Sequence, residues 1–205
     1  MKKPAALAVL DFANIPAGVA AVDAILKRAP IAFMRAGTVT RGRYLVVFGG
    51  STAATSESLN AALVLSESAV IDRTFLPDVH PAIFESLSGT RRKSEGSLLI
   101  VETDTAASIV RAMEAALKGT PVELMELRLS DYGLAGKGIA LLAGSLHDIE
   151  AAASFAAAGA GVDAPPPSGF SFRIIAAPHQ VVERDIAAAT RFDHAPMLEF
   201  DGEWG

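Results

Sequence analysis

Residues 8–11, Ala-Val-Leu-Asp, have a counterpart 91 positions later in residues 99–102, Leu-Ile-Val-Glu, and this pair of short apolar segments decides the fold. The same separation relates further positions in the two halves: Asp23 and Glu114, Lys27 and Lys118, and Pro30 and Pro121. Between His80 and His179 the separation is 99. A separation that increases only between secondary-structure elements is typical of a duplicated domain with loop insertions. The chain is therefore predicted to contain the same domain twice.

Each half predicts the same series of elements. Val19, Val22 and Leu26 follow helical spacing in the first half, and Pro30 ends that helix. The strands are expected at residues 5–11, 31–38, 44–48 and 69–76 and again at 97–102, 122–129, 139–143 and 170–176. The helices are expected at residues 16–29 and 105–119, after the N-cap candidates Ser51 and Ser145, and after His80 and His179. This β-α-β-β-α-β order predicts an α+β fold, an α/β sandwich of two tandem ferredoxin-like domains.

The repeat also divides the chain. We expect a first domain at residues 1–90, a linker at 91–95, a second domain at 96–190 and a C-terminal tail at 191–205. The linker carries Arg91, Arg92 and Lys93, which are expected to be solvated. The tail has no counterpart in the first half.

The composition narrows the class of protein. The chain has 51% hydrophobic residues, yet no stretch approaches the 18–20 consecutive apolar residues of a membrane span. The high mean hydropathy of +0.35 suggests that apolar surface is buried between subunits as well as within them. A net charge of −5 argues against nucleic acid as a partner, and the absence of cysteine excludes disulfides and thiolate metal sites.

No catalytic residue is predicted, because no Ser-His-Asp triad, carboxylate pair or metal-spaced cluster is present. His80 and His179 occupy the same place in both halves, which favours a structural role such as a helix start or a subunit contact. Lys27 and Lys118 each follow an acidic residue by one helical turn. Such a pair stabilises a helix by about 0.2–0.5 kcal/mol, and its repetition also suits an edge that every subunit presents to its neighbours.

These residues together resemble the bacterial microcompartment (BMC) shell domain, in its non-permuted tandem form, over about residues 4–190. The similarity is carried by residues 6–11, by Asp23 to Lys27, by Gly49 and Gly50, and by their counterparts in the second half. It implies a cyclic homotrimer that forms a pseudohexameric tile with a central pore for small metabolites. It further implies edge-to-edge contacts with other hexameric and pentameric shell proteins, in a cytoplasmic microcompartment, without a cofactor. The family's edge lysine corresponds to Lys27 and Lys118, and His80 and His179 are assigned to the same edge.

The resemblance places the pore at the loops between the second and third strands of each half. The expected pore-lining residues are Thr40, Arg41, Gly42, Asp131, Tyr132, Gly133 and Leu134. Thr40 stands where some relatives have a cysteine that binds an iron–sulfur cluster, and a hydroxyl cannot replace that thiolate. Three copies of Arg41 would favour anions, whereas three copies of Asp131 would oppose them.

A second interpretation remains open at this point. A ferredoxin-like regulatory protein that binds small ligands between the subunits of a trimer has the same fold order and hydropathy. The paired lysines and the two loops favour the shell protein, because a ligand sensor does not need either feature twice.

Overall fold

The computed structural model of the chain describes residues 4–93, 95–131, 133–161 and 169–182. The first half contains β1 (Ala6–Phe12), α1 (Ile15–Arg28), β2 (Phe33–Val39), β3 (Arg43–Gly50), α2 (Thr52–Ser66), β4 (Val70–Leu76) and α3 (Pro81–Leu87). The second half contains β5 (Ser97–Thr103), α4 (Ala106–Gly119), β6 (Glu123–Leu129), β7 (Gly138–Gly144), α5 (Leu146–Gly159) and β8 (Phe170–Ile175). The predicted order of elements is thus confirmed from β1 to α3 and from β5 to β8. Of the helix expected after His179, only residues 180–182 lie within the described ranges.

Each half forms its own four-stranded antiparallel sheet. The strand orders, β2-β3-β1-β4 and β6-β7-β5-β8, are the same when the second half is placed on the first. The registers agree as well: Asp11 lies opposite Leu45 and Asp72 in the first sheet, and Glu102 lies opposite Ile139 and Ser171 in the second. This agreement fixes which residues of the two domains are structurally equivalent, and the ferredoxin-like α+β fold is confirmed.

The helices begin where the sequence predicts them. The Ser51 and Ser145 hydroxyls accept hydrogen bonds from the backbone N–H groups of Ala54 and Asp148, as N-caps do. The first helix of each half is capped in the same manner, by Asn14 in α1 and by Thr105 in α4. Because a side-chain cap replaces a hydrogen bond that the first helical turn lacks, these polar residues fix where each helix starts.

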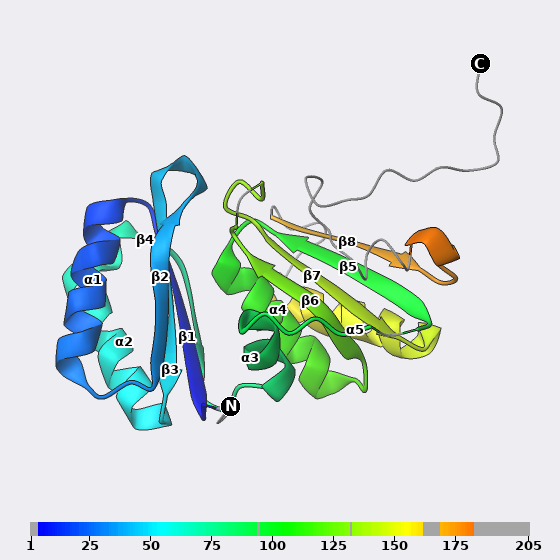
Figure 1. Ribbon diagram of the computed structural model, residues 1–205, viewed down its shortest axis with the longest axis horizontal. Coiled ribbons are helices and arrows are strands. Elements are labelled where there is room, and N and C mark those ends of the chain that lie inside the picture. Colours follow the sequence, from blue (N-terminus) through cyan, green and yellow to red (C-terminus); the bar gives the residue numbers. More distant parts are fainter. Residues whose placement is uncertain (1–3, 94, 132, 162–168, 183–205) are drawn as a thin grey trace, which may run out of the picture.

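The first sheet is covered on both faces (Figure 1). Ala8, Leu10 and Phe12 of β1 point toward α1 and α2 and are buried with them. Leu7 and Val9 point to the opposite face, where they are buried in one cluster with residues of α4 from the second half. Every residue of β1 is therefore buried, and the two domains share an apolar core.

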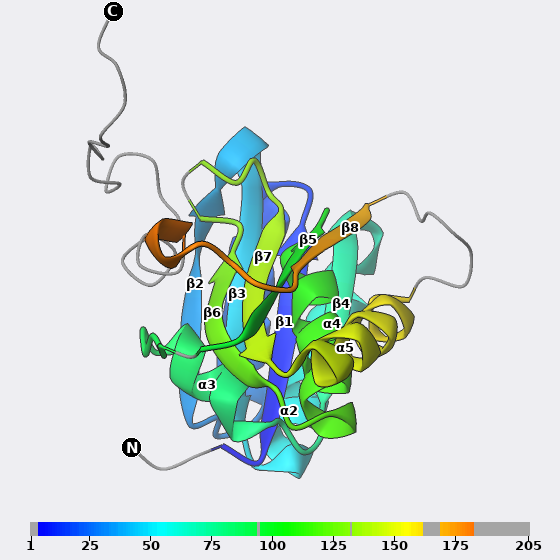
Figure 2. The same ribbon diagram turned by 90° about the vertical axis from the view of Figure 1, so that its right-hand side faces the viewer.

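Helix α4 carries the side chains that make this domain junction. Val110 and Leu117 are almost fully buried in the cluster that contains the first sheet. Between them, the Arg111 guanidinium and the Glu114 carboxylate make hydrogen bonds to residues 72–80 of the first half. Glu114 lies four residues after Val110 and three after Arg111, and Leu117 lies three after Glu114, so the four side chains form one stripe along the helix. Figure 2 shows the same arrangement from the side of the second domain.

Candidate functional site

Two loops, residues 40–42 after β2 and residues 130–131 and 133–137 after β6, project from the same end of the molecule (Figures 1 and 2). Among the described residues, three that are not glycine have a positive φ, and all lie in these loops: Arg41 at 67°, Ser130 at 48° and Ala135 at 51°. Such a conformation costs about 1–2 kcal/mol in a residue with a side chain, and it persists mainly where the surroundings or a function require it. Backbone strain is thus concentrated in the two loops predicted to line a pore.

The two loops differ in whether their charged side chains have partners. In the second loop, Asp131 accepts two hydrogen bonds from the Arg128 guanidinium, at 2.9 and 2.7 Å. The Ser130 hydroxyl donates to the carbonyl of Gly136 at 2.7 Å, which ties the two ends of the loop together. In the first loop, Arg41 is exposed and has no ion-pair or hydrogen-bond partner among the described residues. The negative charge of Asp131 is therefore matched by Arg128 at the end of β6, and the positive charge of Arg41 is not matched among the described residues.

The remaining predicted pore residues lie on the same two loops. Thr40 and Gly42 flank Arg41 and are exposed, as is Gly133 in the second loop. Leu134 is partly buried, and its backbone N–H donates to the carbonyl of Asp131 at 3.1 Å. Tyr132 lies outside the described residues.

An ion pair stands at the base of each loop. In the first half Arg43, at the start of β3, makes two hydrogen bonds to the fully buried carboxylate of Asp11. In the second half Lys137, just before β7, donates to the carboxylate of Glu102 at 2.6 Å. The sheet registers make these two pairs equivalent. Burial raises the pKa of Asp11, and the Arg43 guanidinium opposes that rise. The hydrogen bond with Glu102 raises the pKa of Lys137.

Arg43 also reaches the loop of the other domain. Gly136 has a φ of +93°, and a Cβ atom there would overlap the Arg43 guanidinium. The buried pair of Asp11 and Arg43 therefore supports the second loop from the first domain. Glycine suits position 136, because the positive φ strains any other residue and a Cβ atom there would have to displace the Arg43 guanidinium.

The two predicted edge lysines have different surroundings. Lys27 pairs with Asp23 at 2.6 Å, and both side chains are largely exposed. Lys118 pairs with Glu114 at 2.6 Å and also donates to the backbone carbonyl of Asp78 at 2.6 Å. The hydrogen bond with Glu114 raises the pKa of Lys118. The second lysine thus lies at the junction between the two domains of the chain.

The two histidines start helical turns. The Nδ1 atom of His80 accepts a hydrogen bond from the Ala82 N–H at 3.3 Å, and that of His179 accepts one from Val181 at 3.2 Å. The backbone N–H of His80 donates to the Glu114 carboxylate at 2.9 Å, across the domain junction. His80 therefore joins a helix start to an interdomain contact.

The same junction holds a polar network around Asp72. The Arg111 guanidinium donates to both oxygens of Asp72, at 2.8 and 3.1 Å, and the Thr105 hydroxyl donates as well. Burial alone would raise the pKa of Asp72, but these hydrogen bonds outweigh it and lower the pKa below 3.8. The Thr74 hydroxyl adds a hydrogen bond to the carbonyl of Ala107 at 2.8 Å. The junction is thus fixed by specific polar contacts as well as by apolar burial.

The model of the BMC domain family matches the chain twice, at residues 6–79 and 97–164. The chain belongs to the BMC domain family. It is 28% identical over 160 residues to the bacterial microcompartment shell protein PduT of Citrobacter freundii, over 76% of this chain and 85% of that protein. It superposes with a TM-score of 0.75 on a microcompartment protein from Desulfitobacterium hafniense, with 28% identity over 87% of this chain and 98% of that one. The double-ringed trimeric shell protein MSM0271, at 15% identity and a TM-score of 0.55, shares the fold.

The chain is therefore a microcompartment shell protein with two BMC domains in tandem, and its family is one of structural proteins. This membership favours the shell interpretation over a regulatory ligand sensor. No helix in the described ranges has the length and apolar character of a membrane span. Within those ranges, no three His, Asp or Glu side chains are grouped as a metal site requires.

Several residues of this BMC protein were not singled out by the sequence. The ion pairs below the loops could have been found, because Asp11 and Glu102 were matched in the repeat and Arg43 and Lys137 hold equivalent positions before the next strand. The Arg111 pair could not have been found in that way. Its counterpart in α1 is Ala20, so the repeat carries no sign of it.

Replacing Gly136 by alanine should destabilise the protein more than replacing Gly133. Both residues have a positive φ near 90°, so both variants bear the cost of about 1–2 kcal/mol for that conformation. Only Gly136→Ala also displaces Arg43 from the buried Asp11, and the loss of such a charged hydrogen bond costs about 1.5–3 kcal/mol more. Urea unfolding of both variants measures the difference, and equal losses of stability would contradict the contact between Arg43 and the second loop.

The contribution of Asp72 to stability should depend on pH. Because its pKa is lowered in the folded protein, its ionised form stabilises the fold above the ordinary pKa of about 3.8. That stabilisation is lost as the pH falls through the lower folded-state value. Asp72→Asn should thus be less stable than the wild type by about 1–3 kcal/mol at pH 7, and the gap should close below about pH 4.

Urea unfolding at pH values from 7 to 3 measures this gap. Asp23→Asn is the matched control, since the exposed pair with Lys27 contributes only about 0.5 kcal/mol or less at any pH. A gap for Asp72→Asn that stays constant down to pH 3 would show that the charge is not what stabilises the junction.

Proposed function

We propose that this shell protein forms a cyclic homotrimer, a pseudohexameric tile with a central pore for small metabolites. The proposal rests on the surface of α1, the structural equivalent of α4. Val19 and Leu26 are 51% and 58% exposed, whereas their equivalents Val110 and Leu117 are 0% and 7% exposed at the domain junction. The same apolar positions are therefore covered by the other domain in α4 and exposed to solvent in α1.

The surface that would receive α1 is the outer face of the second sheet. In the first sheet, the face that meets α4 carries Leu7, Val9, Val47 and Leu76. The equivalent positions of the second sheet hold Leu98, Ile100, Leu141 and Ile175, which form an apolar cluster of their own. Leu98 and Leu141 are already buried within the single chain, and Ile100 and Ile175 remain partly exposed.

These two surfaces are different patches, so a contact between them is heterologous and each chain offers one of each. A repeated heterologous contact produces a closed ring when the rotation closes. If every contact has the geometry of the domain junction, three chains with two domains each complete a pseudohexagonal ring. A polar contact can follow the same geometry. The N–H of His179 in one chain would donate to Asp23 of the next, as the N–H of His80 donates to Glu114 within the chain.

In such a ring the two strained loops surround the axis. We assign the pore lining to Thr40, Arg41 and Gly42 from the first loop and to Asp131, Tyr132, Gly133 and Leu134 from the second. Because Arg128 already pairs with Asp131, the three copies of Arg41 would leave a net positive charge at the pore. A positive ring raises the local concentration of small anions.

The outer boundary of the tile would meet other hexameric and pentameric shell proteins, with Lys27, Lys118, His80 and His179 assigned to this edge. The hydrogen bond from Lys118 to the carbonyl of Asp78, across the domain junction, supports a position at a corner where two domains meet. An equivalent corner between chains would then contain Lys27. Residues 1–90 and 96–190 serve as the two domains of the tile and residues 91–95 as their linker, while the proposed tail at 191–205 lies outside the described residues.

Light scattering after size-exclusion chromatography tests the ring. The wild type should have three times the 21.3 kDa mass of the chain. Val19→Asp and Leu26→Asp should have the mass of a single chain, because a carboxylate cannot be buried in an apolar contact without a partner.

The control for these variants is Val64→Asp. Val64 is also apolar and is 91% exposed, but its equivalent Ala158 on α5 is not covered by the other domain. This variant should keep the mass of the wild type. A wild type that remains a single chain at high concentration, or α1 variants that keep a trimer, would contradict the proposed contact.

The pore charge is tested by replacing Arg41 with alanine. In assembled shell layers, this change should lower the permeability to a small anion, relative to a neutral molecule of the same size, by about tenfold. Arg28→Ala, on α1 and away from the loops, is the matched control and should leave the ratio unchanged. An unchanged ratio for Arg41→Ala would remove Arg41 from the account of selectivity.

A further inference from the structure

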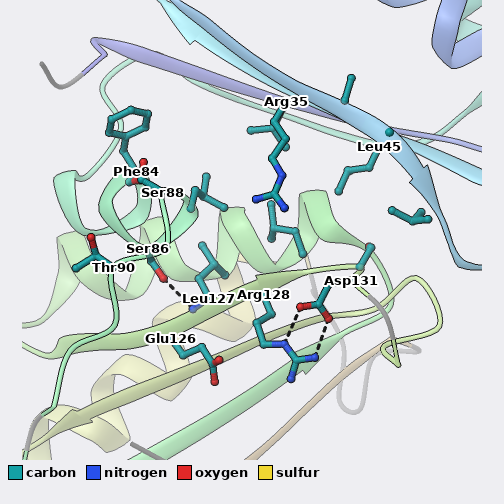
Figure 3. A pocket seen from close by; sticks show the side chains of 18 of the residues that line it. Arg35, Leu45, Phe84, Ser86, Ser88, Thr90, Glu126, Leu127, Arg128 and Asp131 are labelled. Atoms are coloured by element: carbon teal, nitrogen blue, oxygen red, sulfur yellow. Dashed lines mark hydrogen bonds and ion pairs between the residues drawn. The ribbon is translucent and has the colours of Figure 1, made fainter. Parts of the chain in front are cut away.

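A cavity of about 780 Å³ lies between the two domains within one chain (Figure 3). Its walls come from β2, β3 and the start of the first loop, from β6 and the start of the second loop, and from α3 and the segment that follows it. Cavities of about 300–1,000 Å³ are typical of sites that bind small molecules. Its size and its place at a domain interface therefore make it a candidate ligand site.

Arg35 projects into this cavity from β2 (Figure 3). The residue lies opposite Val47 in the register of the sheet, so its side chain is on the face that meets the second domain. β2 is the edge strand of that sheet. Arg35 is exposed and has no hydrogen-bond or ion-pair partner among the described residues. Its five N–H donors are therefore free to bind an acceptor that enters the cavity.

The other charges that line the cavity are largely matched. Arg128 holds Asp131 with two hydrogen bonds, as Figure 3 shows, and Arg91 pairs with Glu126 at 3.0 Å. With Arg35, the lining contains three guanidinium groups and only two carboxylates. The cavity thus carries one net positive charge, at the residue whose donors are uncommitted.

The lining of the cavity also offers apolar surface and hydroxyl groups. The rings of Phe33 and Phe84 pack at a centroid distance of 5.1 Å on one side of the cavity. The Ser86 hydroxyl accepts a hydrogen bond from the backbone N–H of Leu127, which leaves its own proton available to a ligand. A ligand that matches this lining has an anionic head for Arg35 and a compact apolar body for the phenylalanine side.

We propose that this cavity binds a small organic anion, with a carboxylate or phosphate head on Arg35 and an apolar body beside Phe33 and Phe84. Arg35 binds either head in a bidentate manner, since both present paired oxygen acceptors. Thr40 and Asp131 belong to the lining of the cavity, so an occupant would lie next to the loops assigned to the pore. All of its walls belong to one chain, and binding therefore does not depend on whether the trimer forms.

Isothermal titration calorimetry of the full chain with three probes tests this site. Benzoate and phenyl phosphate carry the two candidate heads on the same apolar ring, and benzamide is the uncharged match of benzoate. Both anions or one of them should bind, and benzamide should bind at least about tenfold more weakly, as expected from the loss of a charged hydrogen bond. The tighter of the two anions identifies the head that the site prefers.

Arg35→Gln should weaken the binding of the preferred anion by about tenfold or more and leave benzamide unaffected. The change should not disturb folding, because Arg35 is exposed and unpaired, and circular dichroism checks this. Arg28→Gln, on the opposite side of the first sheet and paired with Glu57, is the matched control and should bind as the wild type does.

Three results would overturn the proposal: equal binding of benzamide and the anions, unchanged anion binding by Arg35→Gln, or no binding of either anion at millimolar concentration. A protein that binds the anion as a single chain would uphold the site even if the proposed trimer is wrong. A trimer without such binding would reject the site alone.

Discussion

The stripe of side chains that α4 lays against the first sheet is the contact on which the rest of this protein depends. A four-stranded sheet has two faces, and α1 and α2 cover only one face of the first sheet. In the first domain, the second face is closed by Val110 and Leu117 from the other domain, and the polar groups of Arg111 and Glu114 set the position. The domain junction is therefore part of the core and not an attachment between two independent units.

This junction also determines where the two loops lie. The buried Asp11 holds Arg43, and Arg43 in turn supports Gly136 in the loop of the second domain. Below each loop lies an ion pair, Asp11 with Arg43 in the first domain and Glu102 with Lys137 in the second. Each loop also contains at least one residue other than glycine with a positive φ. Strained conformations of this kind persist only where the surrounding structure requires them. The same docking of domains encloses the cavity of Arg35, whose walls come from both halves of the chain.

Much of the fold could be predicted from the sequence, because its signals are local. Strand 6–12 is apolar except for Asp11, and Ser51 and Ser145 are strong N-caps. The repeat also gave each element a second, independent occurrence. The likeness of His80 and His179 predicted a shared structural role, and both proved to start helical turns. The pore and edge assignments of the loop residues and lysines remain predictions.

The contacts between the halves could not be predicted in this way. Arg111 and Asp72 are 39 residues apart, and they meet only because α4 docks on β4. The equivalent positions hold Ala20 and Ser171, which cannot form that ion pair. Comparison of the two halves therefore gives no sign of the contact. The cavity likewise has no sequence signal, since Arg35 is an ordinary polar residue of an edge strand until the second domain stands opposite it.

The central claim is that the contact between the domains is made again between chains. An experimental structure of the assembled protein, by crystallography or electron cryomicroscopy, tests it most directly. The account predicts a threefold ring in which Val19 and Leu26 of one chain lie against Ile100 and Ile175 of the next, in the geometry that Val110 and Leu117 have on the first sheet. A twofold assembly, or a ring in which α1 faces solvent, would contradict it.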